Sequence, residues 1–263
     1  MKILSIDFDA IMFPCIRLYN EYCYGDENAT TIWRQLEFER DINQYLSYDA
    51  NAYKNIAQII FKNIKNGAKL IPIQEHQMLV DDLKKHDFLD LQFDITNIDF
   101  HHDIAYHRNS FVEMEFDNYS CADWAGYLLS LNPDTTLTWI RCPGSSMYDE
   151  NIKEFSNTIT IKRIDEIVNL DDDYELIYFC LSPQWVPYTY HHLYNLLIDL
   201  AKEVCPECVD YNIPKPIKVV KEIITEVPVC VAVPYQDPNP NLEPIHIVEQ
   251  VREEPISTEE MEE

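Results

Sequence analysis

The chain has 263 residues, 46% of them hydrophobic and 12% aromatic, which is enough for one large α/β domain or two small domains. The formal net charge of -26 gives a surface that repels phosphate backbones and anionic lipids. We therefore expect neither nucleic acid nor a membrane surface as a direct partner, and we prefer a single large domain.

No apolar run approaches the roughly 18 residues of a membrane span, and the first residues lack the pattern of a signal peptide. The eight cysteines are scattered through a chain too large to need disulfide cross-links. Both features favour a reducing, cytoplasmic location. Cys205 and Cys208 form a single C-x-x-C pair. Because a zinc site needs a second such pair nearby, we expect ordinary thiols here.

Apolar runs predict strands over residues 2–6, 68–73, 93–98, 136–140, 158–161 and 174–181. Helical patterns occupy residues 53–65, 123–131 and 191–204. In the first of these helices four isoleucines share one face, and Gly67 follows as a stop signal. Strands that alternate with helices predict a three-layer αβα domain with a mostly parallel central sheet, over residues 1–210.

The composition changes after about residue 212. Residues 211–263 are rich in Pro, Val, Ile and Glu and contain no Gly. Because the proline spacing excludes long helices and central strands, we predict an acidic, Pro-rich tail that is extended or disordered. Alternatively, its apolar stretches at 217–220 and 245–251 add a strand to a sheet edge or to a protein partner.

Six metal-binding side chains follow apolar strands in three short segments. They are Asp7, Asp9, His76, Asp99, His101 and Asp103. Within two of the segments the candidates recur at every second residue, which on an extended strand puts them on one side. Ligands in parallel α/β sheets collect at the carboxyl ends of the strands. The six side chains therefore predict a two-metal site at that edge, and a metal-dependent enzyme.

This set of residues resembles the ligand inventory of the arginase/deacetylase (ureohydrolase) superfamily. The segment 99–103 looks like its D-A-H-x-D motif, and 5–9 looks like its S-x-D-x-D motif. Segments 121–128, 139–143 and 181–187 sharpen the resemblance toward the peptide arginases and their relatives, over residues 1 to about 200. In arginases the Asp-x-Asp ligands follow the Asp-x-His-x-Asp motif, whereas here they precede it. A circularly permuted strand order would preserve the site.

The resemblance implies an arginase-like fold in which the six residues bind two divalent ions, with some aspartates bridging. We expect Mn²⁺, because carboxylates with one or two imidazoles form a hard, oxygen-rich set. A hydroxide bridging the ions would attack a guanidinium carbon of arginine or peptidyl arginine, releasing urea and leaving ornithine. His102 is the candidate to protonate the leaving amine, since its near-neutral pKa suits proton transfer. Asp123, Glu75 and Glu113 are candidate acceptors for the guanidinium.

Two other functions stay open. The first is a phosphatase of the haloacid-dehalogenase type, whose D-x-D motif the start of the chain also resembles. Asp7 would then be the nucleophile and Asp9 the acid/base, with Asp172 and Asp173 as later Mg²⁺ ligands, but the segment 99–103 would have no role. The second is a non-catalytic binding protein that docks through its tail. The pattern makes no prediction of oligomeric state.

Overall fold

The computed structural model describes residues 1–13, 33–34, 37–38, 47–106, 114, 117–145, 158–170 and 173–209. The tail predicted over 211–263 lies outside these residues, as do Glu113 and Asp172. Among the described residues, no helix is both long and apolar enough to cross a bilayer.

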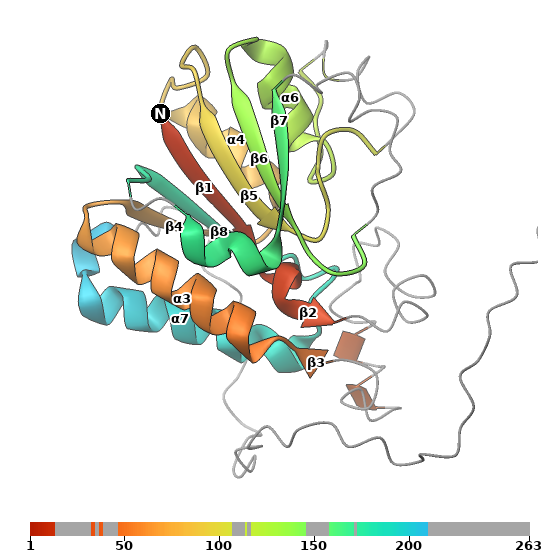
Figure 1. Ribbon diagram of the computed structural model, residues 1–263, viewed down its shortest axis with the longest axis vertical. Coiled ribbons are helices and arrows are strands. Elements are labelled where there is room, and N and C mark those ends of the chain that lie inside the picture. Colours follow the sequence, from red (N-terminus) through yellow and green to blue (C-terminus); the bar gives the residue numbers. More distant parts are fainter. Residues whose placement is uncertain are drawn as a thin grey trace, which may run out of the picture. The chain divides into compact units, whose positions relative to one another are not determined.

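A six-stranded sheet in the order β4-β8-β1-β5-β6-β7 forms the centre of the fold, and every pair of neighbouring strands is parallel (Figure 1). Its strands are β1 (Lys2–Asp7), β4 (Lys69–Ile73), β5 (Asp94–Asp99), β6 (Thr136–Arg141), β7 (Ile159–Arg163) and β8 (Leu176–Cys180). All six predicted strands are therefore confirmed, with bounds that differ by no more than a few residues. Two short strands, β2 (Met12–Phe13) and β3 (Ser47–Tyr48), form a separate antiparallel pair.

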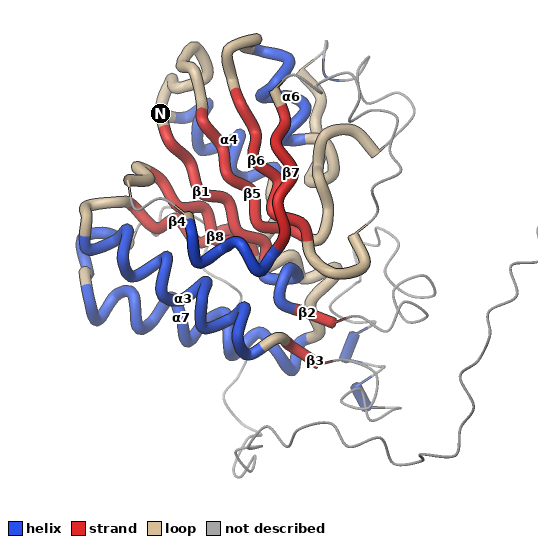
Figure 2. The backbone as a smooth tube through the Cα atoms, viewed as in Figure 1, coloured by secondary structure: helices blue, strands red, loops and turns tan. Residues whose placement is uncertain are grey.

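Helices cover both faces of the sheet, as the three-layer prediction requires (Figures 1 and 2). One face carries α3 (Ala50–Lys65) and α7 (His191–Val204), and the other carries α4 (Gln77–Lys85) and α6 (Trp124–Leu131). The prediction missed α4, whose short sequence places only three apolar side chains in the core. Four 3-10 helices complete the described elements: η1 (Phe8–Ile11), η4 (Ile164–Asn169), η5 (Tyr188–Tyr190) and η6 (Pro206–Cys208).

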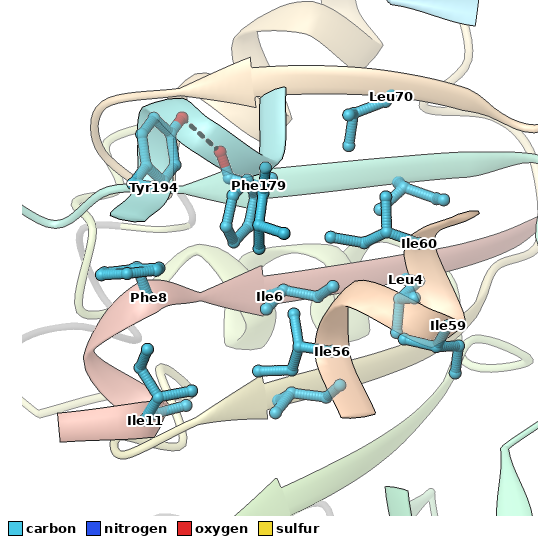
Figure 3. Close-up of a cluster of buried hydrophobic side chains, with 14 of the residues drawn as sticks. Leu4, Ile6, Phe8, Ile11, Ile56, Ile59, Ile60, Leu70, Phe179 and Tyr194 are labelled. Atoms are coloured by element: carbon cyan, nitrogen blue, oxygen red, sulfur yellow. Dashed lines mark hydrogen bonds between the residues drawn. The ribbon is translucent and has the colours of Figure 1, made fainter. Parts of the chain in front are cut away.

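Strand alternation divides the core into two clusters. In β1, Leu4 and Ile6 point toward α3 and α7, while Ile3 points to the cluster under α4 and α6. Figure 3 shows the first cluster, where the isoleucines of α3 pack over β1. The Tyr194 hydroxyl donates to the carbonyl of Phe179 at 2.8 Å and so ties α7 to the end of β8. These contacts hold the carboxyl ends of the strands together.

Local signals set the ends of α3. The Asp49 carboxylate accepts hydrogen bonds from the backbone N–H groups of Asn51 and Ala52, which caps the first turn. Gly67, with a φ of 98°, follows the last turn, as predicted. The prediction for Cys205 and Cys208 was wrong, because they form a disulfide. The turn of η6 brings their Cα atoms within 5.3 Å, a distance that a disulfide spans.

Candidate metal centre

All six predicted metal ligands lie at the carboxyl-terminal ends of the parallel strands β1, β4 and β5. In the sheet, β1 is the direct neighbour of β5, and β8 lies between β1 and β4. His76 follows β4, and the last residues of β1 and β5 are Asp7 and Asp99. This end of the strands therefore gathers side chains that are up to 96 positions apart in the sequence, from Asp7 to Asp103.

We expected the alternate residues of segments 5–9 and 99–103 to lie on one side of an extended strand. This was wrong, because the strands end at Asp7 and Asp99. Asp9 lies in η1, and His101 and Asp103 lie in the loop after β5. The carboxylates of two candidate ligands stabilise the turns that follow the strands: Asp7 Oδ1 accepts from the Asp9 N–H at 3.0 Å, and Asp99 Oδ1 accepts from the His101 N–H at 2.8 Å. These two Asx-type turns fold the following ligands back over the strand ends.

One group of side chains surrounds His76, and we call it the His76 cluster. His76 Nδ1 lies 3.0 Å from Asp103 Oδ2, 3.4 Å from Asp99 Oδ2 and 3.5 Å from Asp7 Oδ2. All four residues are buried. Three carboxylates therefore converge on one ring nitrogen in the buried interior of the protein.

A second group, the His101 cluster, consists of His101, Asp9 and Asp99. His101 Nδ1 lies 3.3 Å from Asp9 Oδ2 and 3.8 Å from Asp99 Oδ1. The two carboxylate oxygens of Asp99 therefore face different imidazoles, Oδ2 toward His76 and Oδ1 toward His101. In this arrangement one carboxylate joins two ligand groups, as a bridging ligand does. The His101 side chain is 21% exposed, so this cluster lies nearer the surface.

Burial and mutual repulsion perturb the carboxylates. Burial raises the pKa of Asp7 from its usual 3.8 to about 7, and the charge of Asp9 adds to the effect. Burial also raises the pKa of Asp99 well above its usual value, helped by the neighbouring carboxylates. Anionic forms of both groups are therefore costly unless a positive charge lies between them.

The imidazoles supply part of that positive charge. Burial opposes charging of His76 and His101, but the surrounding carboxylates outweigh it and raise the pKa of both rings. Burial likewise opposes ionisation of Asp103, yet its hydrogen bond with His76 and the charges of both histidines lower its pKa. Protons on the two rings therefore stand where cations would bind, between ring nitrogens and carboxylate oxygens.

Two observations indicate that the centre could hold a metal ion. The buried Asp9 Oδ2 accepts no well-formed hydrogen bond from any described residue, and only the His101 ring nitrogen, 3.3 Å away, offsets its charge there. The donor set combines four carboxylates with two imidazoles, which suits Mn²⁺ and similar hard ions. The ligand atoms of Asp9, Asp99 and His101 lie within 4.8 Å of one another, as do those of His76, Asp99 and Asp103.

Neutral groups from four parts of the chain hold the side chains of the His76 cluster. The contacts are Ser5 Oγ with His76 Nε2 (3.0 Å), Asn97 Nδ2 with Asp99 Oδ2 (3.1 Å), Trp124 Nε1 with Asp103 Oδ2 (2.7 Å) and Ser182 Oγ with Asp7 Oδ2. A tautomer with the His76 proton on Nε2 donates to Ser5 and leaves Nδ1 with a lone pair for a cation.

None of these neutral groups was predicted to contact the cluster, although one of them follows from a pattern in the sequence. Asn97 lies two residues before Asp99 on β5, which places both on the same side of the strand. Ser5, Trp124 and Ser182 fall within segments that carry the family resemblance. Their contacts with the cluster join positions 71 and 175 residues apart in two cases, so local pattern alone could not reveal them.

His102 is fully buried in a setting that differs from that of the ligands. Its ring stacks on Tyr106 at 4.1 Å between centroids and meets Trp139 edge-on at 5.6 Å. Its Nδ1 accepts a hydrogen bond from the Ile104 N–H at 3.1 Å. This packing holds the ring firmly, and its role as a proton shuttle stays a prediction.

The two described candidates for guanidinium acceptor, Asp123 and Glu75, differ in their burial and in their hydrogen-bond partners. Asp123 is buried, and its oxygens accept from the Tyr106 N–H at 3.2 Å and the Ser120 hydroxyl at 2.7 Å. Glu75 is half-buried beside His76, and only neutral amides bind its carboxylate in the described part of the chain: Gln77 at 2.7 Å and Gln184 at 2.7 Å. Glu75 is therefore the candidate whose charge is not balanced by a cationic side chain there.

The phosphatase alternative loses one of its proposed ligands. Asp173 forms an ion pair with Lys2 at 2.7 Å, and Lys2 begins the strand that Asp7 ends. The six residues of β1 place these ends roughly 16 Å apart, at about 3.3 Å per residue. Asp173 therefore lies at the amino-terminal end of the strands, and Asp7 lies at their carboxyl-terminal end.

Comparison with known proteins found no matching family model, no similar curated protein and no similar solved structure. What the centre does is therefore inferred from its own residues and their geometry.

Proposed function

We propose that this protein is a binuclear metal-dependent hydrolase of the arginase/deacetylase type. It acts on a guanidino group, releasing urea from arginine or peptidyl arginine and leaving ornithine. The observation that carries the proposal is the position of Asp99, whose two oxygens face two different imidazoles across a buried, acidic centre. A carboxylate that faces two imidazoles in this way is suited to be shared by two metal ions.

In this proposal the His76 cluster holds one Mn²⁺ ion and the His101 cluster holds the other, with Asp99 common to both. When bound, two such ions lower the pKa of a water molecule and polarise the substrate. The neutral groups of the chain around the His76 cluster keep its carboxylates oriented. The sheet order is consistent with the resemblance to the superfamily, because β1 and β5 are neighbours. Their two motifs meet at one edge whatever their order along the chain.

The surroundings of His101 suit a planar cation. The Trp185 ring lies 4.7 Å from the His101 ring, and Gln184 next to it binds Glu75. A guanidinium entering beside Trp185 would find the Glu75 carboxylate as its acceptor. When the C–N bond breaks, the leaving amine needs a proton. The proposal assigns this proton to His102 in its imidazolium form, because a neutral imidazole is too weak an acid to protonate an amine. In the structure His102 Nδ1 accepts from the Ile104 N–H, so the ring must give up that hydrogen bond to become charged.

The experiment combines metal stoichiometry with urea release. The full chain, stripped with a chelator and dialysed against Mn²⁺, should hold two ions by mass spectrometry and release urea from arginine or arginine peptides. Asp99→Ala should abolish both properties in a folded protein. Asp173→Ala is the matched control: it should be fully active here, whereas the phosphatase alternative requires that residue. Two bound ions without urea from any guanidino compound would refute the reaction.

A further inference from the structure

Ser182 has a backbone conformation that serine rarely adopts. Its φ is 47°, in the left-handed region that favours glycine, and only 6% of the residue is exposed. It lies two residues beyond the end of β8, the strand between β4 and β1. A buried non-glycine residue in this region is strained, and such strain persists where the surrounding structure enforces it.

Hydrogen bonds on both sides fix the Ser182 backbone. Its N–H donates to the Gln74 carbonyl at 3.0 Å, and its own carbonyl accepts from the N–H groups of Trp185 at 2.9 Å and Val186 at 3.0 Å. The first bond ties it to the chain just before His76, and the others close a turn that carries Trp185 against His101. The turn therefore touches both halves of the candidate metal centre.

The side chain of Ser182 points toward Asp7. Its hydroxyl donates to Asp7 Oδ2, while Asp7 Oδ1 accepts from the Asp9 N–H at 3.0 Å. Both oxygens of Asp7 are thereby held by neutral donors, and Oδ2 lies 3.5 Å from His76 Nδ1. Cys180 Sγ lies 3.3 Å from Ser182 Oγ, so a thiol donating to that oxygen leaves the hydroxyl proton to Asp7.

We propose that Ser182 is a positioning residue, which holds the Asp7 carboxylate for cation binding at the cost of backbone strain. The inference rests on the proposed metal centre. Glycine at position 182 would remove the strain but also the donor, so the two properties can be separated by substitution. A residue that only shaped the turn would be replaced by glycine without loss.

The experiment compares Ser182→Gly with Ser182→Ala in the full chain. Free Mn²⁺ is measured by electron paramagnetic resonance during titration of the metal-free proteins, and thermal unfolding is recorded in parallel. Both variants lack the hydroxyl, so both should lose roughly 10- to 100-fold in Mn²⁺ affinity, the usual effect of removing a group that orients a metal ligand. The glycine variant should unfold at a higher temperature than the alanine variant, because it is not strained.

Asp87→Gly is the matched control. Asp87 also has a positive φ of 57°, but it lies at the end of α4 in an exposed turn. This change should raise the unfolding temperature and leave Mn²⁺ affinity at the wild-type value.

Wild-type affinity in Ser182→Gly together with weak binding in Ser182→Ala would overturn the inference, because strain would then explain the loss. Wild-type affinity in both variants would overturn it as well. Neither result affects urea release, so the proposed function would survive. Conversely, if Mn²⁺ affinity depends on the Ser182 hydroxyl but the wild-type chain releases no urea, the reaction alone would be refuted. A wild-type chain that binds no Mn²⁺ would overturn both.

Discussion

Without bound cations, we expect the protein to lose stability as the pH rises from about 4 to about 7. Asp7 carries the largest readable part of the effect, since its pKa is about 7 in the fold against a usual value of 3.8. At about 1.4 kcal/mol per pH unit, this difference corresponds to about 4 kcal/mol of unfolding free energy.

The sign follows from proton linkage. A folded state with a raised carboxyl pKa binds more protons than the unfolded state between the two pKa values, so stability falls as the pH rises. Asp99 acts in the same direction. The raised pKa values of His76 and His101 add stability that is present below their usual 6.5 and is lost as the pH rises through the folded values. Asp103, with a lowered pKa, acts oppositely and only below about 4.

Urea-induced unfolding followed by circular dichroism, at pH 5 and pH 8 with a chelator, measures the effect. The same pair of measurements with saturating Mn²⁺ should reverse the order, because cations replace the missing protons at pH 8. Asp7→Asn should flatten the dependence in the metal-free protein. Equal or greater stability of the metal-free wild type at pH 8 would refute our account of the centre as buried acidic groups without compensation.

Three further predictions concern single positions. Removal of His101 by His101→Ala should leave one Mn²⁺ per chain, whereas Asp99→Ala should leave none, as mass spectrometry after dialysis would show. Glu75→Gln should raise KM for guanidino substrates roughly 10- to 100-fold with Mn²⁺ affinity unchanged, in line with loss of a charged hydrogen bond; an unchanged KM would exclude Glu75. Gly126→Ala should destabilise the fold by about 3 kcal/mol or more in thermal unfolding, since the added Cβ would lie 1.8 Å from the Ile104 carbonyl oxygen. By contrast, Gly67→Ala meets no atom and should cost about 1–2 kcal/mol through its positive φ alone.

The elements of the fold were readable from local pattern. Each buried strand is a short apolar run because both faces of a parallel sheet are covered, and α3 shows the helical spacing of its isoleucines. The prediction that six ligand-type side chains meet at one edge also follows, because carboxyl ends of parallel strands share an edge. The helix α4 was missed, since nine residues with three buried apolar side chains give a weak periodic signal.

The sequence by itself thus determined the six candidate ligands and their common position at the carboxyl-terminal ends of the strands. It did so through the apolar runs that form the strands and the polar residues that follow each run. Only the tertiary structure decided which side chains face each other. The same alternation of strands and helices along the chain is compatible with many strand orders. Local sequence therefore does not predict that β8 lies between β4 and β1. That order brings Ser182 to Asp7 and gives Asp99 two imidazole neighbours, and it places Asp173 at the amino-terminal end of the strands beside Lys2. Such contacts depend on packing between elements distant in the chain, where burial changes both the geometry and the charge of each group.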